Sequence, residues 1–320
     1  MLDYGTYIRS RESYRKLLSG KQKERLAHTF LIESKDSDLG LMYSKQLAKI
    51  IIAGSDISNS KIDKNIHPDV KVYGQQKKFN AEDAGEIISD VLVLPFEADA
   101  KVYIIANAEN MNEESQNKLL KTLEEPPASS YFILSAKNEK TLLQTVISRS
   151  KKIMVEEPTE TEIVSLLGYA GYEGDNAIIA SVCAGNDASK ALKMVESNSF
   201  IKLYSNVLEM FRVMNSSRDI LKFVEKFSSR DFVINDFLTI VESIAIDLVY
   251  IISGENQLVS NKHKMSELKV IASGFTCLAL SKILKECFDF RESLYYNVNI
   301  TPALDGFLLK FVEVKVKCKK

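Results

Sequence analysis

The strongest constraint on the fold is an alternation of short apolar strands and amphipathic helices along the first 155 residues. The run "KVYIIA" (101–106) has almost no polar interruption, which is typical of a central strand buried on both faces of a sheet. Segments with helical spacing of apolar residues lie between this run and three other extended runs, "HTFLI" (28–32), "VKVY" (70–73) and "YFILSA" (131–136). This order predicts a parallel sheet with helices on both of its faces.

Two helices between these strands have clear boundaries in the sequence. The segment "AEDAGEIISDVLVL" (81–94) predicts a helix that stops before a proline. The segment "NEESQNKLLKTLEE" (112–125) predicts another, with Asn112 as N-cap, two glutamates in the positive first turn and a double proline after its end. We expect its apolar stripe in the core, and the stripe consists of Leu119, Leu120 and Leu123.

The pattern changes to helices alone after about Val155. Short helical segments with glycine breaks come first, and from about Phe200 apolar residues recur at three- and four-residue spacing. The fold class is therefore α/β plus all-α. We predict an α/β domain over residues 1–156, a small helical domain over 157–200 and a helical bundle over 201–320.

Composition limits the classes of function. The chain has 320 residues, with 42 basic and 43 acidic side chains and a formal net charge of −1, so a nucleic-acid contact would need a local patch. The longest apolar stretch, 237–252, contains two acidic residues and is too short for a membrane span. The polar start of the chain does not have the pattern of a signal peptide. We expect a cytoplasmic globular protein.

The cysteines and histidines do not form a metal-binding or disulfide pattern. The four cysteines include no C-x-x-C pair, and the three histidines lie far apart in the sequence. Cys277 and Cys287 lie in apolar helical sequence, where we expect free thiols as small core residues. His67, directly before Pro68, is expected to be a turn residue and not a metal ligand.

Three segments resemble a known family: "HPDV" (67–70), "KVYIIANAENMNEESQNKLLKTLEEPP" (101–127) and "FILSAKNEKTLLQTVISRS" (132–150). They are similar to delta-prime subunits of the bacterial DNA polymerase III clamp loader, within the AAA+ proteins. The resemblance is good over roughly residues 25–155 and weaker beyond them. It implies a RecA-like AAA+ domain, a helical lid and a collar that joins five subunits in a ring. The cysteine-rich zinc module of many members is absent from 53–65.

The phosphate-binding loop of active members is not present here. Such a loop needs G-x-x-x-x-G-K-[ST], because the glycines let the backbone wrap the phosphates, the lysine neutralises charge and the hydroxyl binds Mg²⁺. The corresponding segment is "ESKDSDLGLMY" (33–43), and the four required positions hold Ser34, Leu39, Gly40 and Leu41. Asp36 and Asp38 add negative charge where phosphates would bind, which is repulsive.

The other nucleotide positions also lack their functional groups. The Asp-Glu pair that holds Mg²⁺ in active members corresponds to Ala106 and Asn107. Glu109 follows closely, and we expect it at a surface or an interface. The lid arginine corresponds to Ser189, with Lys190 nearby. The resemblance therefore implies a module that does not hydrolyse ATP and needs no cofactor or metal.

One arginine of this sequence matches the residue through which family members act on the nucleotide of a neighbouring subunit. The sequence "SRS" (148–150) resembles the S-R-C motif of clamp-loader subunits, with Ser150 in place of cysteine. In the family this arginine reaches the γ-phosphate bound by the adjacent subunit, where a planar guanidinium can donate to two oxygens. The residues alone leave an ordinary surface arginine open, whereas the resemblance implies that Arg149 is an arginine finger. Ser148 is a candidate site residue beside Arg149, and we expect it to cap the following segment, with contact to the nucleotide as the alternative.

Three functions are open at this stage. The first is a non-hydrolysing subunit of the DNA polymerase III holoenzyme, which works with gamma/tau ATPase subunits and the clamp-opening delta subunit to load the sliding clamp onto primed DNA. The second is an active gamma/tau-like ATPase of the same machine. The third is an unrelated helical adaptor with a degenerate P-loop domain. The basic end "KVKCKK" (315–320) is expected to be solvated, with contact to DNA or a partner as the alternative.

Overall fold

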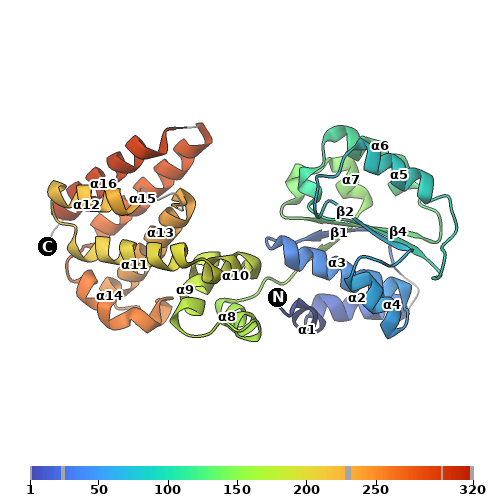
Figure 1. Cartoon of the computed structure of the whole chain (residues 1–320), viewed down its shortest axis with the longest axis horizontal. Helices are drawn as coiled ribbons and strands as arrows, with labels where there is room; N and C mark the ends of the chain where they lie inside the picture. The colour runs from blue at the N-terminus through green and yellow to red at the C-terminus, as the bar shows by residue number, and fades with distance from the viewer. Residues whose placement is uncertain (1, 23–25, 228–231, 297, 318–320) are drawn as a thin grey trace. The chain divides into compact units, whose positions relative to one another are not determined.

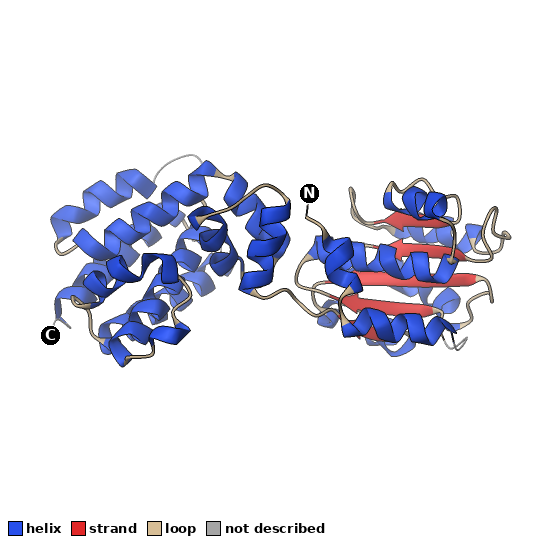
Figure 2. Ribbon diagram, turned by 90° about the horizontal axis from the view of Figure 1, so that it is seen from below, coloured by secondary structure: helices blue, strands red, loops and turns tan. Residues whose placement is uncertain are grey.

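The structure is a computed structural model that describes residues 2–22, 26–227, 232–296 and 298–317. The chain divides into two compact units, and each is described by itself. The first consists of Met1–Thr159 with Asn186–Ser189, and the second of Glu160–Gly185 with Lys190–Lys320. Within the described ranges the strands all belong to the first unit, and the second unit is helical (Figures 1 and 2).

A five-stranded parallel sheet forms the centre of the first unit, in the order β2-β3-β4-β1-β5. The strands are β1 (Thr29–Glu33), β2 (Val70–Tyr73), β3 (Lys101–Ile105), β4 (Ser130–Ala136) and β5 (Lys151–Met154). This strand order is that of a RecA-like domain, so the predicted fold class is confirmed. Because the strands are parallel, their carboxyl ends meet at one edge, where open α/β sheets bind ligands.

Helices cover both faces of this sheet (Figure 1). The helices of the first unit are α1 (Tyr4–Arg9), α2 (Glu12–Gln22), α3 (Ser37–Ile52), α4 (Asp56–Asp63), α5 (Ala81–Asp90), α6 (Glu113–Glu124) and α7 (Gln144–Arg149), with short 3-10 turns η1 (Ala108–Asn110) and η2 (Glu139–Thr141). Figure 1 shows α5, α6 and α7 on one face and α1 to α4 on the other. The core under α6 contains Leu119 and Leu123, with Leu120 partly buried against it, as predicted. Asn112 caps α6 by accepting a bond from the Ser115 N–H, at 2.9 Å.

The helix predicted over 81–94 is shorter than expected and ends at Asp90, as helix α5. The buried Asp69 carboxylate accepts backbone N–H bonds from Phe96, Glu97 and Ala98 at 2.6, 2.8 and 3.0 Å. These three bonds hold the chain in a turn that a continuing helix could not reach. A distant carboxylate therefore overrides the local helical pattern after α5.

The second unit is a helical assembly around an aromatic core. Its helices are α8 (Glu160–Tyr169), α9 (Asp175–Ala184), α10 (Ala188–Glu196), α11 (Asn198–Val213), α12 (Ser217–Phe227), α13 (Ile234–Ser253), α14 (Met265–Ala272), α15 (Cys277–Ser293) and α16 (Ile300–Lys317), with 3-10 turns η3 (Asn256–Leu258), η4 (Lys262–Lys264) and η5 (Leu294–Tyr296). Phe211, Phe275 and Phe311 pack together with ring centroids 5.1–6.2 Å apart. No helix in the described ranges is long and apolar enough to cross a bilayer. The division of this unit into a lid and a collar stays a prediction.

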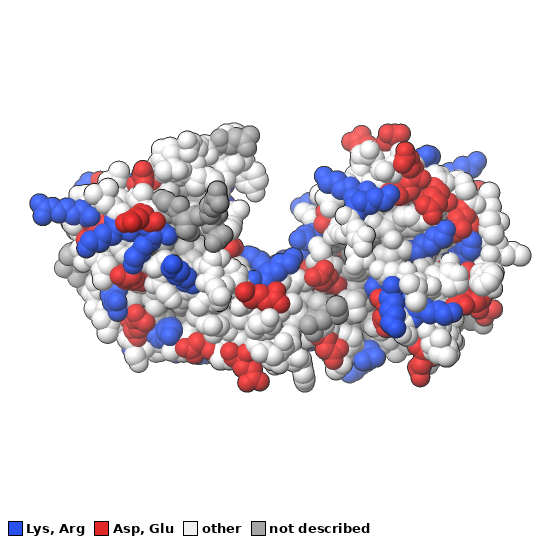
Figure 3. All heavy atoms as spheres, in the orientation of Figure 1, with Lys and Arg blue, Asp and Glu red and all other residues white. Residues whose placement is uncertain are grey.

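Two expectations for the helical unit were wrong. Cys277 is exposed at the start of α15, because the apolar face of that helix passes through Ala279, Leu280 and Ile283 instead. Lys315 is buried, not solvated, and its Nζ donates to the Phe211 carbonyl at 2.6 Å. The last residues of the basic segment, 318–320, lie outside the described residues. On the face seen in Figure 3, basic and acidic side chains are interspersed on both units.

Burial should make the cysteines differ sharply in reactivity. Burial raises the pKa of the Cys183 thiol to about 12 and also raises the pKa of Cys287, so both lack the reactive thiolate, whereas Cys277 is exposed. In a Cys318→Ser variant, a disulfide reagent at mildly alkaline pH should therefore modify one thiol of the folded chain rapidly. The others should react only in denaturant. Rapid labelling of Cys183 in the native chain would contradict this packing.

Candidate functional site

The N-terminus of α3 carries a buried carboxylate. The segment after β1 leads directly into α3, and Asp36 is the N-cap residue. Its Oδ1 accepts bonds from the backbone N–H groups of Asp38 and Leu39, at 2.9 and 3.1 Å. Asp36 has 0% exposed area. A negative charge at this point is favourable, since the first N–H groups of a helix lack partners and its N-terminus is positive.

Three more donors complete the shell around this carboxylate. The Tyr4 hydroxyl donates to Asp36 Oδ2 at 2.5 Å. Ser189 donates through both its backbone N–H, at 3.0 Å to Oδ2, and its hydroxyl, at 2.5 Å to Oδ1. Burial, and next the negative charge of Asp36, raise the pKa of Tyr4, so its phenol remains a donor. With the two helix N–H groups, five donors converge on one carboxylate.

The Asp36 carboxylate lies where the fold favours an anion. A helix N-terminus after a parallel strand is an anion-binding position, because its N–H groups and dipole favour negative charge. In this chain the anion is the side chain of Asp36 itself. Ser189, at the position predicted for a lid arginine, is one of its donors although it lies 153 residues further along the chain.

The aligned loop positions are filled by packing. Leu39 and Leu41 are buried, and the Ser34 hydroxyl donates to the Asp36 carbonyl at 2.9 Å. At Gly40, where the family has its lysine, an added Cβ would lie 3.5 Å from the Ser34 Cβ and 3.6 Å from the Ser135 Cβ. The helix therefore lies close against β4 and leaves little space there for a longer side chain.

The edge of the sheet next to this loop contains almost no free space. The residues around it are Ser34, Ser37, Gly40, Asn107, Glu109, Ser135, Ala136 and Lys137. The volume that a water-sized molecule could occupy among them is about 0 Å³. Binding sites for small molecules usually have ~300–1,000 Å³. The side chains at this edge are therefore closely packed.

Ala106 and Asn107 correspond to the Asp-Glu pair of active family members, and both have structural roles in this chain. Ala106 is buried, and Asn107 adopts a left-handed conformation with φ of 51° while its Nδ2 donates to the Gly74 carbonyl at 3.0 Å. Gly74 also has positive φ, and an added Cβ would lie 2.1 Å from the Ala106 carbonyl oxygen. Glu109 accepts the backbone N–H of Lys137 at 3.3 Å. Among the described residues, no group of three metal-binding side chains is present.

Sequence reasoning missed a second carboxylate at the loop. Glu157 Oε1 accepts the Lys35 backbone N–H at 2.6 Å, and its Oε2 is buried without a partner. Burial raises the pKa of Glu157, and the hydrogen bond from the Lys35 backbone N–H partly counteracts this. Two acidic side chains thus bind the loop N–H groups that would otherwise face a phosphate. No local pattern predicts this, since Glu157 lies 122 residues from Lys35.

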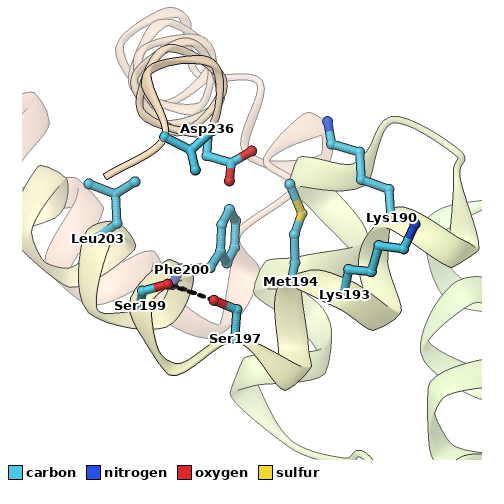
Figure 4. Close-up of a pocket in the computed structure, with 9 residues that line it drawn as sticks. Lys190, Lys193, Met194, Ser197, Ser199, Phe200, Leu203 and Asp236 are labelled. Carbon is cyan, nitrogen blue, oxygen red and sulfur yellow. Dashed lines mark hydrogen bonds between the residues drawn. The ribbon is translucent and has the colours of Figure 1, made fainter. Parts of the chain in front are cut away.

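Lys190, the basic residue nearest to the predicted lid position, lines a different cavity. This cavity of about 260 Å³ lies in the second unit (Figure 4), and its lining also includes Lys193, Met194, Ser197, Ser199, Phe200, Leu203, Val233 and Asp236. Burial raises the pKa of Asp236, and the positive charge of Lys190 counteracts this. Lys190 therefore provides a positive charge beside Asp236 in the helical unit.

His67 is structural, as predicted. Its Nε2 is 2.9 Å from the Ser58 hydroxyl, and its Nδ1 accepts the Asp69 N–H at 3.1 Å. Helix α4 occupies much of the segment 53–65, where many members of the resembling family have a zinc module.

Arg149 is the last residue of α7. Its NH1 donates to the Thr145 carbonyl and its NH2 to Glu124 Oε1, both at 2.9 Å. Its Nε is buried without a partner. Ser148 donates to the Thr145 carbonyl at 3.2 Å, so its hydroxyl binds the preceding turn and not the following segment as we expected. The hydroxyl of Ser150 likewise returns to the Val146 carbonyl, at 2.8 Å.

Comparisons with known proteins show which families the chain resembles. A family model described as "DNA polymerase III, delta subunit" matches residues 10–159. DNA polymerase III subunit delta' of Bacillus subtilis is 22% identical over 319 residues, covering 93% of this chain and 94% of that protein. Over most of its length the chain is similar to delta-prime subunits of DNA polymerase III.

Two further proteins are also similar to this chain. An uncharacterized MG007 homologue of Mycoplasma pneumoniae is 27% identical over 146 residues, covering 45% of this chain, which spans about half (54%) of that protein. A DNA polymerase III gamma-subunit-related structure from Thermotoga maritima has 16% identity and a TM-score of 0.46, over 95% of this chain and 100% of that one. The family model thus covers nearly all of the first unit, which contains Asp36 and Arg149.

Removing the buried carboxylate should destabilise the chain. Asp36→Ala leaves five donors without their acceptor, and we expect a loss of about 2–4 kcal/mol in the free energy of unfolding. Asp38→Ala is the matched control, because Asp38 is exposed in the same helical turn, and it should cost less than about 1 kcal/mol. Urea denaturation followed by circular dichroism measures both. Equal effects of the two variants would show that Asp36 is not a structural centre.

Proposed function

We propose that this chain is a non-hydrolysing delta-prime-type clamp-loader subunit, which binds no nucleotide itself and donates Arg149 to the ATP site of a neighbouring subunit. The observation that carries the proposal is the position of Asp36. Its carboxylate is buried at the N-terminus of α3 with five donors, where a bound nucleotide would place a phosphate. The subunit would contribute to ATP hydrolysis only through its neighbour.

Electrostatics favours the carboxylate over a phosphate at this position. A nucleotide phosphate beside Asp36 would be repelled by about 4 kcal/mol per unit charge at 4 Å, for an effective dielectric constant near 20. It would also have to displace a side chain that already satisfies five donors. An active gamma/tau-like ATPase is therefore the weaker interpretation, since it would need the lysine and the acidic pair that Gly40, Ala106 and Asn107 do not supply.

The proposal includes the setting in which the chain acts. We infer that it assembles with gamma/tau ATPase subunits and the delta subunit in the cytoplasm, and that the complex loads the sliding clamp onto primed DNA. The relatives named DNA polymerase III subunits delta' and gamma support this partner set. The interspersed charges and the net charge of −1 suit a subunit that meets DNA mainly through the complex.

The isolated chain should not respond to Mg-ATP. A ligand present at a hundredfold its dissociation constant stabilises the native state by about 2.7 kcal/mol, which raises the melting temperature of a domain of this size by several degrees. We expect no shift beyond error at millimolar Mg-ATP, measured by differential scanning fluorimetry. The partner ATPase subunit serves as the positive control. A reproducible shift of several degrees in the isolated chain would refute the absence of a nucleotide site.

Replacement of the finger should affect the assembly and not the fold. Arg149→Ala should leave the melting temperature and complex formation unchanged, because Arg149 is partly exposed, but should lower DNA-stimulated ATP hydrolysis by the complex several-fold. A trans arginine finger contributes ~10³–10⁵ in GTPases, and we expect less in a ring with several sites. Arg149→Lys should not restore the rate, since an ammonium lacks the planar fork. Wild-type hydrolysis by the Arg149→Ala complex would eliminate the finger role.

A further inference from the structure

In the chain by itself, before any neighbouring subunit binds, the Glu124 carboxylate fixes the orientation of the Arg149 side chain. Helices α6 and α7 pack against one another. The two terminal nitrogens of the guanidinium are each held by a bond of 2.9 Å, one to the Thr145 carbonyl and one to Glu124 Oε1. One anchor comes from the arginine's own helix and the other from α6. Two bonds from different elements determine the plane of the guanidinium as well as its position.

Folding stability does not explain this pair. The side chains of Arg149 and Glu124 are 32% and 55% exposed, and ion pairs with such exposure contribute little to stability. Glu124 is also the last residue of α6, where the negative end of the helix disfavours a carboxylate. The Nε donor of Arg149 is buried without a partner, which a purely stabilising arrangement would avoid.

The bonded guanidinium retains the donors that a phosphate needs. A guanidinium has five N–H donors, of which two are used by Thr145 and Glu124. Each terminal nitrogen keeps one further N–H, and about a third of the side chain is exposed. Arg149 can therefore approach an anion while both anchors remain in place. Holding a long side chain in advance reduces the rotamer entropy that is lost when it meets its target.

We propose that Glu124 is a positioning residue for Arg149, which orders the guanidinium before the subunit meets its neighbour. This inference rests on the proposed function of Arg149 as a trans finger. Glu124 would make no contact with the nucleotide, and its whole effect on hydrolysis would pass through the arginine. Its neighbour Glu125, which is also exposed at the end of α6, provides a matched comparison.

The test is steady-state ATP hydrolysis by the complete complex with primed DNA, measured as kcat and KM. We expect Glu124→Ala to lower kcat about two- to fivefold, the range that corresponds to one partly exposed ion pair, with KM unchanged. Glu124→Gln, whose amide oxygen can still accept from Arg149, should lose less. Glu125→Ala should behave like the wild type. Size-exclusion chromatography and melting curves check that each variant still folds and assembles.

The decisive comparison is made in the absence of the arginine. In an Arg149→Ala background, adding Glu124→Ala should change kcat no further, since a positioning residue has nothing left to position. An equal loss in both backgrounds, or a wild-type or raised rate for Glu124→Ala alone, would overturn the positioning role. If Arg149→Ala itself hydrolyses ATP like the wild type, the proposed function of Arg149 fails first, and that result is recognised before any Glu124 variant is considered.

Discussion

The bonds between the Asp36 carboxylate and its five donors are the interaction on which the rest of this account depends. They connect the first turn of α3, the N-terminal helix α1 through Tyr4, and Ser189. The same N–H groups that bind a phosphate in a nucleotide site are here satisfied by the chain itself. One residue thus links three parts of the first unit and, in the proposed function, takes the place of a bound phosphate.

The two candidate regions of this unit follow a common logic. After β1 the Asp36 carboxylate is the anion at the N-terminus of α3. The positive end of that helix is therefore already neutralised by the chain itself. At the end of α7 it retains a cation, Arg149, whose carboxylate partner is exposed and whose guanidinium keeps free donors. The proposed function requires both features, a chain that binds no nucleotide at α3 and an arginine that is available to a neighbour. The loss and the retention are therefore consistent with one function.

Much of the fold could be predicted from sequence because the decisive signals were local. Apolar runs located β1 to β4, and Asn112 caps α6 as its side-chain chemistry required. The sequence also predicted that Asp36 would repel phosphate, but not that it would be buried as the acceptor of Ser189, since that contact joins residues 153 positions apart. The exposure of Cys277 and the burial of Lys315 were missed because helical spacing does not define which face is covered.

The most direct test of the central claim is equilibrium dialysis of the isolated chain against labelled ATP and Mg²⁺. The structure predicts no saturable binding up to millimolar nucleotide, because the carboxylate of Asp36 already occupies the N-terminus of α3. Saturable binding of one ATP per chain would contradict it. A substitution at Gly40, where α3 lies against β4, would abolish that binding if the nucleotide occupies this site.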